Sequence, residues 1–295
     1  MSELSNQIAA TAAFFDIFDY PLTDFEIWQY LDVPAPYADV RADIRSRNGD
    51  APLFCLHDAS RLASIRRERY AVTQAKIRTA RRRLTLIAWI PWIRLIALAN
   101  VIGTHNLRAE GDIDLFIVTK KNRLWLVKLI ATAILALTRL RPRRGTVRDT
   151  LCLSFLVDET ALDLSVFRLD ADRYLTYWLD GLIPLYGDKS AYPQLIEANP
   201  WLRTALPNRL PKHDSGQRFT LKRWRIMPEF GLGTIMERIA RLLLRFIMSP
   251  EIKRALSRPG SGVVVTDHVL KLHTGDRRQH FRKEYEKRLR LYATS

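Results

Sequence analysis

Residues 101–118 read VIGTHNLRAEGDIDLFIV, and this stretch decides how the chain is organised. The apolar run 93–102 predicts a strand buried on both faces, and the run 114–118 predicts a second one. Residues two apart in a strand point to the same face, so Asp112 and Asp114 should project together from the start of the second strand. Two adjacent carboxylates repel each other, and a divalent cation that prefers oxygen ligands, Mg²⁺ or Mn²⁺, relieves that repulsion. The stretch therefore predicts a metal-binding pair.

The end of the first predicted strand adds two small residues to this candidate site. Gly103 has no Cβ, so backbone amides there can approach a triphosphate closely, and the Thr104 hydroxyl can donate a hydrogen bond to a phosphate oxygen. His105 could also contact a phosphate, although an exposed loop histidine is the simpler interpretation. The alternative for Asp112 and Asp114 is a turn aspartate and a strand-edge aspartate satisfied by backbone amides.

Gly-Thr, a short polar loop and Asp-x-Asp followed by apolar residues resemble the signature of the DNA polymerase β-like nucleotidyltransferase superfamily, in which Gly-Ser precedes Asp-x-Asp. Segments 15–23, 111–117, 151–155 and 184–187 are also similar to those of bacterial proteins without an assigned activity that join a winged-helix-like segment to a nucleotidyltransferase domain. The resemblance implies transfer of a nucleoside monophosphate from an NTP to a hydroxyl acceptor, with Mg²⁺ required.

In this resemblance Asp112 and Asp114 are the catalytic metal ligands, and Gly103 and Thr104 bind the nucleotide. The superfamily's third carboxylate lies in the middle of a neighbouring strand. The predicted strand 151–157 offers no carboxylate there, and the nearby acids that remain open as candidates are Asp149, Asp158 and Asp163. A catalytically inactive nucleotidyltransferase-fold protein, acting as a nucleic-acid-binding or regulatory module, is therefore the alternative function.

The N-terminal part, residues 1–60, reads as a winged-helix-like module. Apolar periodicity and breakers predict a first helix whose apolar face runs from Ile8 to Phe18, then helices over 23–31 and 37–46, followed by a short strand over 53–56. Thr23 and Glu26 have the spacing of a capping box at the start of the second helix. Basic residues on or after the third helix stand where a DNA reader would place them, but winged helices also dock proteins. These residues are Arg41, Arg45 and Arg47.

The rest of the chain divides into three predicted parts. Residues 61–85 form a basic connecting helix, and residues 86–170 form the α/β (α+β) nucleotidyltransferase core, with a helix over 123–140 between its second and third strands. Residues 171–295 form a helical C-terminal region, which by resemblance would contact the acceptor or the base.

Charge and composition limit the partners. Lys and Arg number 47 against 31 Asp and Glu, so the net charge of +16 favours a polyanion such as nucleic acid, an NTP or an anionic membrane surface. The apolar segment 124–140 contains charged residues and is too short to span a bilayer, but the arginines after it leave peripheral membrane contact open. The two cysteines, Cys55 and Cys152, read as small buried hydrophobic residues of a reducing compartment, and we expect a cytoplasmic protein.

Overall fold

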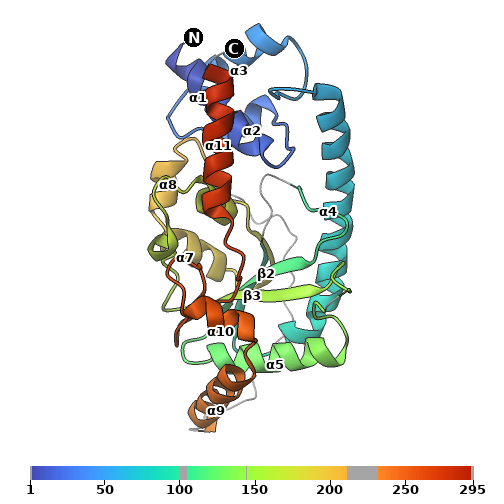
Figure 1. Cartoon of the computed structure of the whole chain (residues 1–295), viewed down its shortest axis with the longest axis vertical. Coiled ribbons are helices and arrows are strands. Elements are labelled where there is room, and N and C mark those ends of the chain that lie inside the picture. The colour runs from blue at the N-terminus through green and yellow to red at the C-terminus, as the bar shows by residue number, and fades with distance from the viewer. Residues whose placement is uncertain (1, 100–104, 144, 211–231, 294–295) are drawn as a thin grey trace.

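The computed structural model describes residues 2–99, 105–143, 145–210 and 232–293. Within these residues the chain is mixed α/β, with eleven α-helices around one six-stranded sheet, which confirms the α/β class. Figure 1 shows the sheet at mid-height, with helices α1 to α3 above it and α5 and α9 below it. The strands are β1 (Ile93–Leu98), β2 (Ile113–Thr119), β3 (Leu151–Asp158), β4 (Ile183–Gly187), β5 (Val264–Val265) and β6 (Val269–Lys271).

The sheet has the order β4-β1-β2-β3-β6-β5. Strands β2 and β3 are parallel and are joined by helix α5 (Leu124–Leu137), as a parallel pair requires a crossover. Every other neighbouring pair of described strands is antiparallel. The acidic pair therefore lies next to the single crossover unit of the described sheet.

Side chains of the central strands alternate between two hydrophobic cores. Phe116 and Val118 belong to the core that also contains buried residues of α1 to α3 and α6, whereas Leu115 and Ile117 belong to the core shared with α4 and α5. This period of two is the geometry of a strand with both faces covered, and each fully buried Leu or Phe stabilises the fold by about 1.5–3 kcal/mol. Asp114 is on the same side of β2 as Phe116, and so it points toward the first core.

The N-terminal part forms three helices, α1 (Glu3–Asp16), α2 (Asp24–Tyr30) and α3 (Tyr37–Asn48). The predicted capping box is confirmed: the Glu26 backbone amide donates to Thr23 Oγ1 at 3.1 Å, and the Thr23 amide donates to Glu26 Oε2 at 2.9 Å. Where a strand was predicted over 53–56, the structure has an isolated bridge between Leu22 and Phe54. A paired wing is thus not present among the described residues of this part.

Helix α4 (Ala59–Ala88) connects the N-terminal helices to the far side of the sheet (Figure 1). Its 30 residues span about 45 Å. Near its start Arg66 forms an ion pair with Glu26 of α2 at 2.8 Å, and near its end Leu84 and Ile87 are buried in the core below the sheet. The helix therefore braces two parts of the molecule, as its basic, sparsely apolar sequence predicts.

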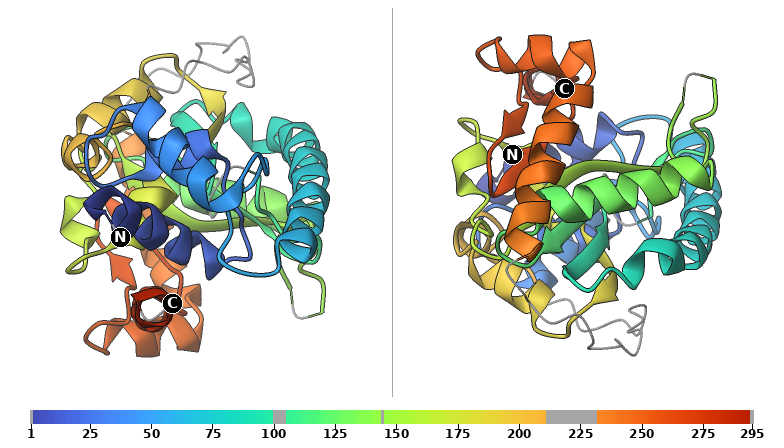
Figure 2. Two further views of the ribbon diagram at one scale, coloured as in Figure 1. Left: turned by 90° about the horizontal axis from the view of Figure 1, so that it is seen from above. Right: turned by 90° about the horizontal axis from the view of Figure 1, so that it is seen from below.

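Helix α9 (Leu232–Ile247) packs beneath the sheet against α5, as the view from below in Figure 2 shows. Glu237 of α9 is buried, and its two carboxylate oxygens accept hydrogen bonds from the backbone amides of Trp125 and Leu126 at 2.8 and 2.9 Å. These amides belong to the first turn of α5, where helical backbone donors lack partners and the helix dipole favours a negative charge. Glu237 thus caps α5 and fixes α9 to it.

The region after residue 170, expected to be helical, also supplies strands β4, β5 and β6 to the sheet. Its last helix returns to the N-terminal part, where Arg288 Nε lies 2.8 Å from Asp16 Oδ2 of α1. Both ends of the described chain consequently lie at the same end of the molecule (Figure 1). The other helices of this region are α6 (Arg173–Asp180), α7 (Ala191–Glu197), α8 (Trp201–Ala205), α10 (Pro250–Leu256) and α11 (Arg278–Ala293). Residues Ser165–Phe167, which precede α6, form a 3-10 turn.

Among the described helices, none combines the length and the apolar character that crossing a membrane would require.

Gly187 gives a test of the edge pairing between β4 and β1. It has φ +141°, and a Cβ at this position would lie 2.3 Å from the Arg94 carbonyl oxygen. We expect Gly187→Ala to lower the free energy of unfolding by more than about 2 kcal/mol, because strained backbone and a steric clash add. Denaturant-induced unfolding measures this loss.

Gly260→Ala is the matched control, because Gly260 also has a positive φ, +73°, but no atom lies within 4 Å of the added Cβ. It should lose only about 1 kcal/mol. Equal losses for the two variants would mean that the close approach of β4 to β1 contributes nothing.

Candidate functional site

The acidic pair lies at the start of the central strand β2. Asp112 directly precedes the strand and Asp114 is its second residue. Both side chains are half-buried, and a ligand atom from each of Asp112, Asp114 and Cys152 lies within 4.8 Å of the other two. The structure therefore brings the two predicted site residues together, as the period of the strand requires.

Cys152 is a site residue that sequence reasoning missed. It is the second residue of β3 and stands opposite Asp114 in the parallel β2–β3 pairing. The sequence offered one signal: Cys152 and Ser154 alternate with leucines and so should point to one face of their strand. That signal could not show that Cys152 points to the same side of the sheet as the acidic pair, because the sequence does not reveal the register between β2 and β3.

The Cys152 thiol is neutral in this environment. Burial raises the pKa of Cys152 to about 12, and the negative charges of Asp114 and Asp112 act in the same direction. The carboxylate oxygens are the hard donors that Mg²⁺ and Mn²⁺ prefer, whereas a neutral thiol is a poor ligand for either ion. Among the three residues, Asp112 and Asp114 fit such an ion, and Cys152 occupies the space beside it.

The acids considered as a third carboxylate all have other roles. Asp149 Oδ1 lies 2.8 Å from Lys76 Nζ, and the fully buried Asp158 lies 2.8 Å from His268 Nδ1. Asp163 Oδ1 accepts a hydrogen bond from the backbone amide of Ser165 at 2.8 Å. Within the described part of the chain, none of the three belongs to the cluster that contains Asp112 and Asp114.

Helix α4 holds the loop that leads into the acidic pair. The sequence did not reveal this contact between α4 and the loop. Three α4 side chains spaced four and three residues apart, and so on one face of the helix, bond to this loop. The hydrogen bonds are Arg69 Nη1 donating to Asn106 Oδ1 (2.9 Å), the Leu107 amide donating to Thr73 Oγ1 (2.9 Å) and Lys76 Nζ donating to the Gly111 carbonyl (2.6 Å). Lys76 is only 3% exposed and also pairs with Asp149, so it fixes the residue before Asp112 from inside the protein.

The two predicted nucleotide-binding residues, Gly103 and Thr104, lie outside the described residues. His105, which follows them, is half-buried, and its ring centroid lies 4.7 Å from that of Tyr70 on α4. The described part of the loop thus begins with an aromatic contact to the bracing helix.

A pocket of about 370 Å³ opens beside Asp114. Strands β2 and β3, helix α6 and the segment between β6 and α11 form its walls. Phe155 and Trp178 are stacked in one wall, with ring centroids 5.5 Å apart, and Tyr174 and Phe281 are stacked in another at 5.2 Å. The pocket therefore combines a carboxylate with flat aromatic surfaces.

Charged groups of the β6–α11 segment line the same pocket. Asp276 lies at their centre, with Arg278 Nη2 at 2.6 Å and Lys271 Nζ at 3.4 Å from its Oδ2. Burial opposes ionisation of Asp276, but hydrogen bonds from Arg278 outweigh burial and lower the pKa of Asp276 to about 2. Arg277 and His273 line the pocket as well and are exposed, so they are the groups best placed to contact an incoming anion.

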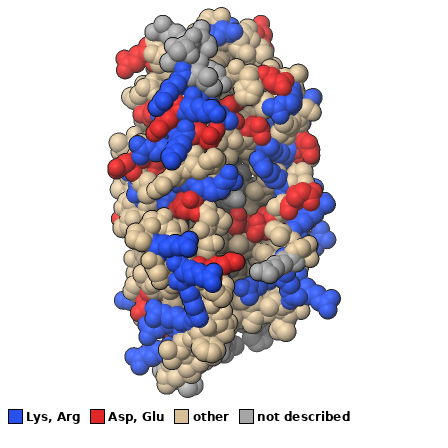
Figure 3. All heavy atoms as spheres, viewed as in Figure 1, with Lys and Arg blue, Asp and Glu red and all other residues tan. Residues whose placement is uncertain are grey.

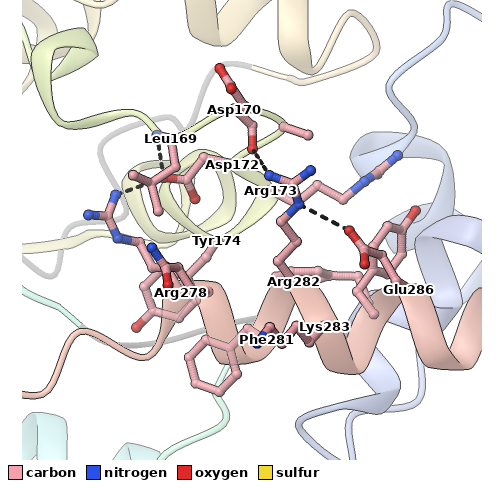
Figure 4. A pocket seen from close by; sticks show the side chains of 14 residues that line it. Leu169, Asp170, Asp172, Arg173, Tyr174, Arg278, Phe281, Arg282, Lys283 and Glu286 are labelled. Carbon is pink, nitrogen blue, oxygen red and sulfur yellow. Dashed lines mark hydrogen bonds and ion pairs between the residues drawn. The ribbon is translucent and has the colours of Figure 1, made fainter. Parts of the chain in front are cut away.

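A second pocket of about 490 Å³ lies between α6 and α11 (Figure 4). Its arginines pair with acidic neighbours: Arg173 pairs with Asp32, Arg278 Nη1 lies 2.7 Å from Asp172 Oδ2, and Arg282 Nε lies 3.0 Å from Glu286 Oε1. Phe281 lines both pockets. Because these charges are already paired, the second pocket offers less to an anion than the pocket beside Asp114.

Much of the positive charge is paired elsewhere too. On the face shown in Figure 3, acidic and basic side chains are interspersed over the upper half. The three arginines predicted as DNA-reading residues each lie within 3.6 Å of a carboxylate, in the pairs Arg41 with Asp24, Arg45 with Asp50 and Arg47 with Asp43.

Comparison of the chain with protein-family models, with curated proteins and with solved structures finds no match.

The Asp276 cluster generates a pH-dependent prediction. A carboxylate whose pKa falls from 3.8 to about 2 on folding contributes stability above pH 4, and this contribution is lost as the pH falls through 2. We expect Asp276→Asn to lower the free energy of unfolding by about 2 kcal/mol at pH 6. The difference from the unsubstituted chain should shrink steadily between pH 4 and pH 2, as denaturant titrations at each pH would show.

A difference that stayed constant down to pH 2 would contradict this account. It would mean that Asp276 contributes by shape and neutral hydrogen bonding instead of by charge.

Proposed function

We propose that this chain is a nucleotidyltransferase that moves a nucleoside monophosphate from an NTP to a hydroxyl acceptor, with Mg²⁺ or Mn²⁺ bound by Asp112 and Asp114. The observation that carries the proposal is the convergence of these two carboxylates at the start of β2, within 4.8 Å of each other and next to the aromatic, basic pocket. The strand, crossover helix and parallel strand around them agree with the resemblance of residues 103–118 to the superfamily signature.

In this reaction the acceptor oxygen forms a bond to the α-phosphorus, the bond from that phosphorus to pyrophosphate breaks, and the acceptor proton passes to water. A bound divalent cation would neutralise phosphate charge and orient the reacting groups. The protein's own contribution is positional. Asp112 and Asp114 would hold the ion at a fixed point of the sheet, and Lys76 keeps the preceding Gly111 in place from α4.

The pocket beside Asp114 suits a nucleotide. Trp178 and Tyr174 line it, and bases stack on aromatic rings with little regard to sequence. Arg277 and His273 stand at the same pocket, where they can contact phosphate or an anionic acceptor. Asp114 is the residue shared by the pocket and the acidic cluster, so a nucleotide held there would lie next to the ion.

The decisive experiment removes the two carboxylates together. NTPs labelled at the α-phosphate are incubated with the chain, Mg²⁺ and candidate acceptors, and label is sought in protein, RNA and small molecules. In Asp112→Asn/Asp114→Asn we expect transfer to fall by more than about a hundredfold, because the amides cannot hold the ion. The Mg²⁺-dependent rise in Tm with NTP should vanish in the same variant.

Glu110→Gln is the matched control, because this exposed acid lies in the same loop, outside the cluster. It should retain both transfer and the thermal shift. If the double variant kept full activity, or if Glu110→Gln lost as much, the assignment of the metal ligands would be wrong.

A second candidate function is favoured by one observation: among the described residues, the cluster around Asp112 and Asp114 contains Cys152 and no third carboxylate. On this alternative the chain binds an NTP as a regulatory or nucleic-acid-binding module without transferring it. DNA reading by α3 has less support, since the three arginines given above are each paired with a carboxylate. Binding of NTP with no labelled product under any condition would favour the second candidate.

Cys152→Asp tests how this position affects the site. A third carboxylate beside Asp112 and Asp114 should increase affinity for Mg²⁺, and we expect about a tenfold lower Mg²⁺ concentration at half-maximal thermal stabilisation. Cys152→Ser, which adds no charge, should leave that concentration unchanged. No difference between the two variants would place Cys152 outside the ion's reach.

A further inference from the structure

Helix α9 exposes an unusually large apolar surface for a helix that is fixed to the core. Two of its residues, Leu242 and Phe246, are 67% and 82% exposed. Scattered apolar residues on a protein surface need no explanation, but a contiguous patch of this kind marks an interaction site. The exposed apolar residues of α9 are Ile235, Met236, Ile239, Leu242, Leu243, Phe246 and Ile247, which we call the α9 stripe.

The α9 stripe is one continuous face of the helix. Its members recur at spacings of three and four residues, which places them on one side at 100° per residue. The adjoining side of the helix is the packed one, where Glu237 caps α5 and Ala240 and Leu244 are buried. The helix therefore cannot turn its stripe inward without losing the contacts that hold it to α5.

Basic side chains border the stripe. Arg238, Arg245 and, on α10, Arg254 are all exposed. In the two helices the acids are Glu237, which is buried against α5, and Glu251. In the lowest part of Figure 3, basic side chains lie beside uncharged surface. An apolar stripe with an arginine-rich border is the pattern of a helix that lies in the plane of a membrane interface.

From this geometry we infer that the α9 stripe docks onto an anionic lipid surface. The apolar side chains enter the boundary between headgroups and acyl chains, and the bordering arginines contact lipid phosphates. A second copy of the chain is a poorer occupant, because pairing two stripes about a two-fold axis would bring the arginines of both copies together with few acids to meet them. The inference does not depend on the proposed nucleotidyl transfer.

This surface differs from the one that the sequence suggests. The apolar segment 124–140 is followed by arginines, a pattern that favours membrane contact, but its helix, α5, buries Leu124, Trp125, Leu126 and Leu135 in the core below the sheet. Helix α9 lies on the outer side of α5 and takes the exposed position instead (Figure 2). Because α5 joins the two strands of the acidic cluster, the docked face is one helix away from the candidate site.

Co-sedimentation of the full chain with vesicles tests the inference. Vesicles of phosphatidylcholine with phosphatidylglycerol should carry the chain down, and vesicles of phosphatidylcholine alone should do so about tenfold less well. Leu242→Ser/Phe246→Ser should reduce sedimentation with anionic vesicles by about tenfold. Val166→Ser is the matched control, because Val166 is 73% exposed on the 3-10 turn outside α9, and it should bind as the unsubstituted chain does.

Unchanged Tm in both variants would show that folding is intact, as substitution of exposed residues predicts. If the double variant nevertheless unfolded, Arg238→Gln/Arg254→Gln would replace it. This variant should bind anionic vesicles less well than the unsubstituted chain, and in 0.5 M salt the variant and the unsubstituted chain should bind equally weakly. Failure of the unsubstituted chain to sediment with anionic vesicles would overturn the inference. So would a dimer in light scattering that dissociates in Leu242→Ser/Phe246→Ser while no vesicle binding occurs, since the stripe would then belong to a second copy.

Discussion

The parallel pairing of β2 and β3 is the constraint on which the candidate site depends. It sets Asp114 opposite Cys152, and it holds the strand that carries the two carboxylates in the middle of the sheet. Like charges at this spacing raise the free energy of the folded state unless something positive comes between them. The fold tolerates that cost because the strands beneath are buried on both faces, in two separate cores that α5 and the N-terminal helices close.

Part of the positive charge stabilises the fold, which the amino-acid composition alone does not show. Along α4, arginines and a lysine are bonded to carboxylates, carbonyls and an amide of other elements, and the buried Lys76 reaches the backbone just before Asp112. A helix that reads as a polyanion-binding face therefore also serves as a brace, in which Arg66, Arg69 and Lys76 each lie within 3.2 Å of a carboxylate. Exposed cations for an outside partner remain on α4 itself, such as Arg78 and Arg82, and at Arg277 beside the pocket.

The sequence predicted the local features well and the long-range ones poorly. Runs of apolar residues revealed β1, β2 and β3, and the Thr23 capping box followed from spacing alone. Strands β5 and β6 have two and three residues, too few to show a period, and they pair only because β3 offers an edge. The convergence of Asp112 and Asp114 could be predicted because both lie at the start of one strand. The positions of Cys152 in the cluster and of Asp276 in the pocket could not, because they depend on how distant segments pair, which no local pattern contains.

The path of α11 has a consequence for how the molecule is made. The acidic pair is synthesised well before Lys271, Asp276 and Phe281, which line the pocket beside it, because translation proceeds from the N-terminal side. Helix α11 then contacts α1, which is synthesised before every strand of the described sheet. A nascent chain therefore displays its two carboxylates before the pocket beside them can form, because that pocket needs side chains of the β6–α11 segment.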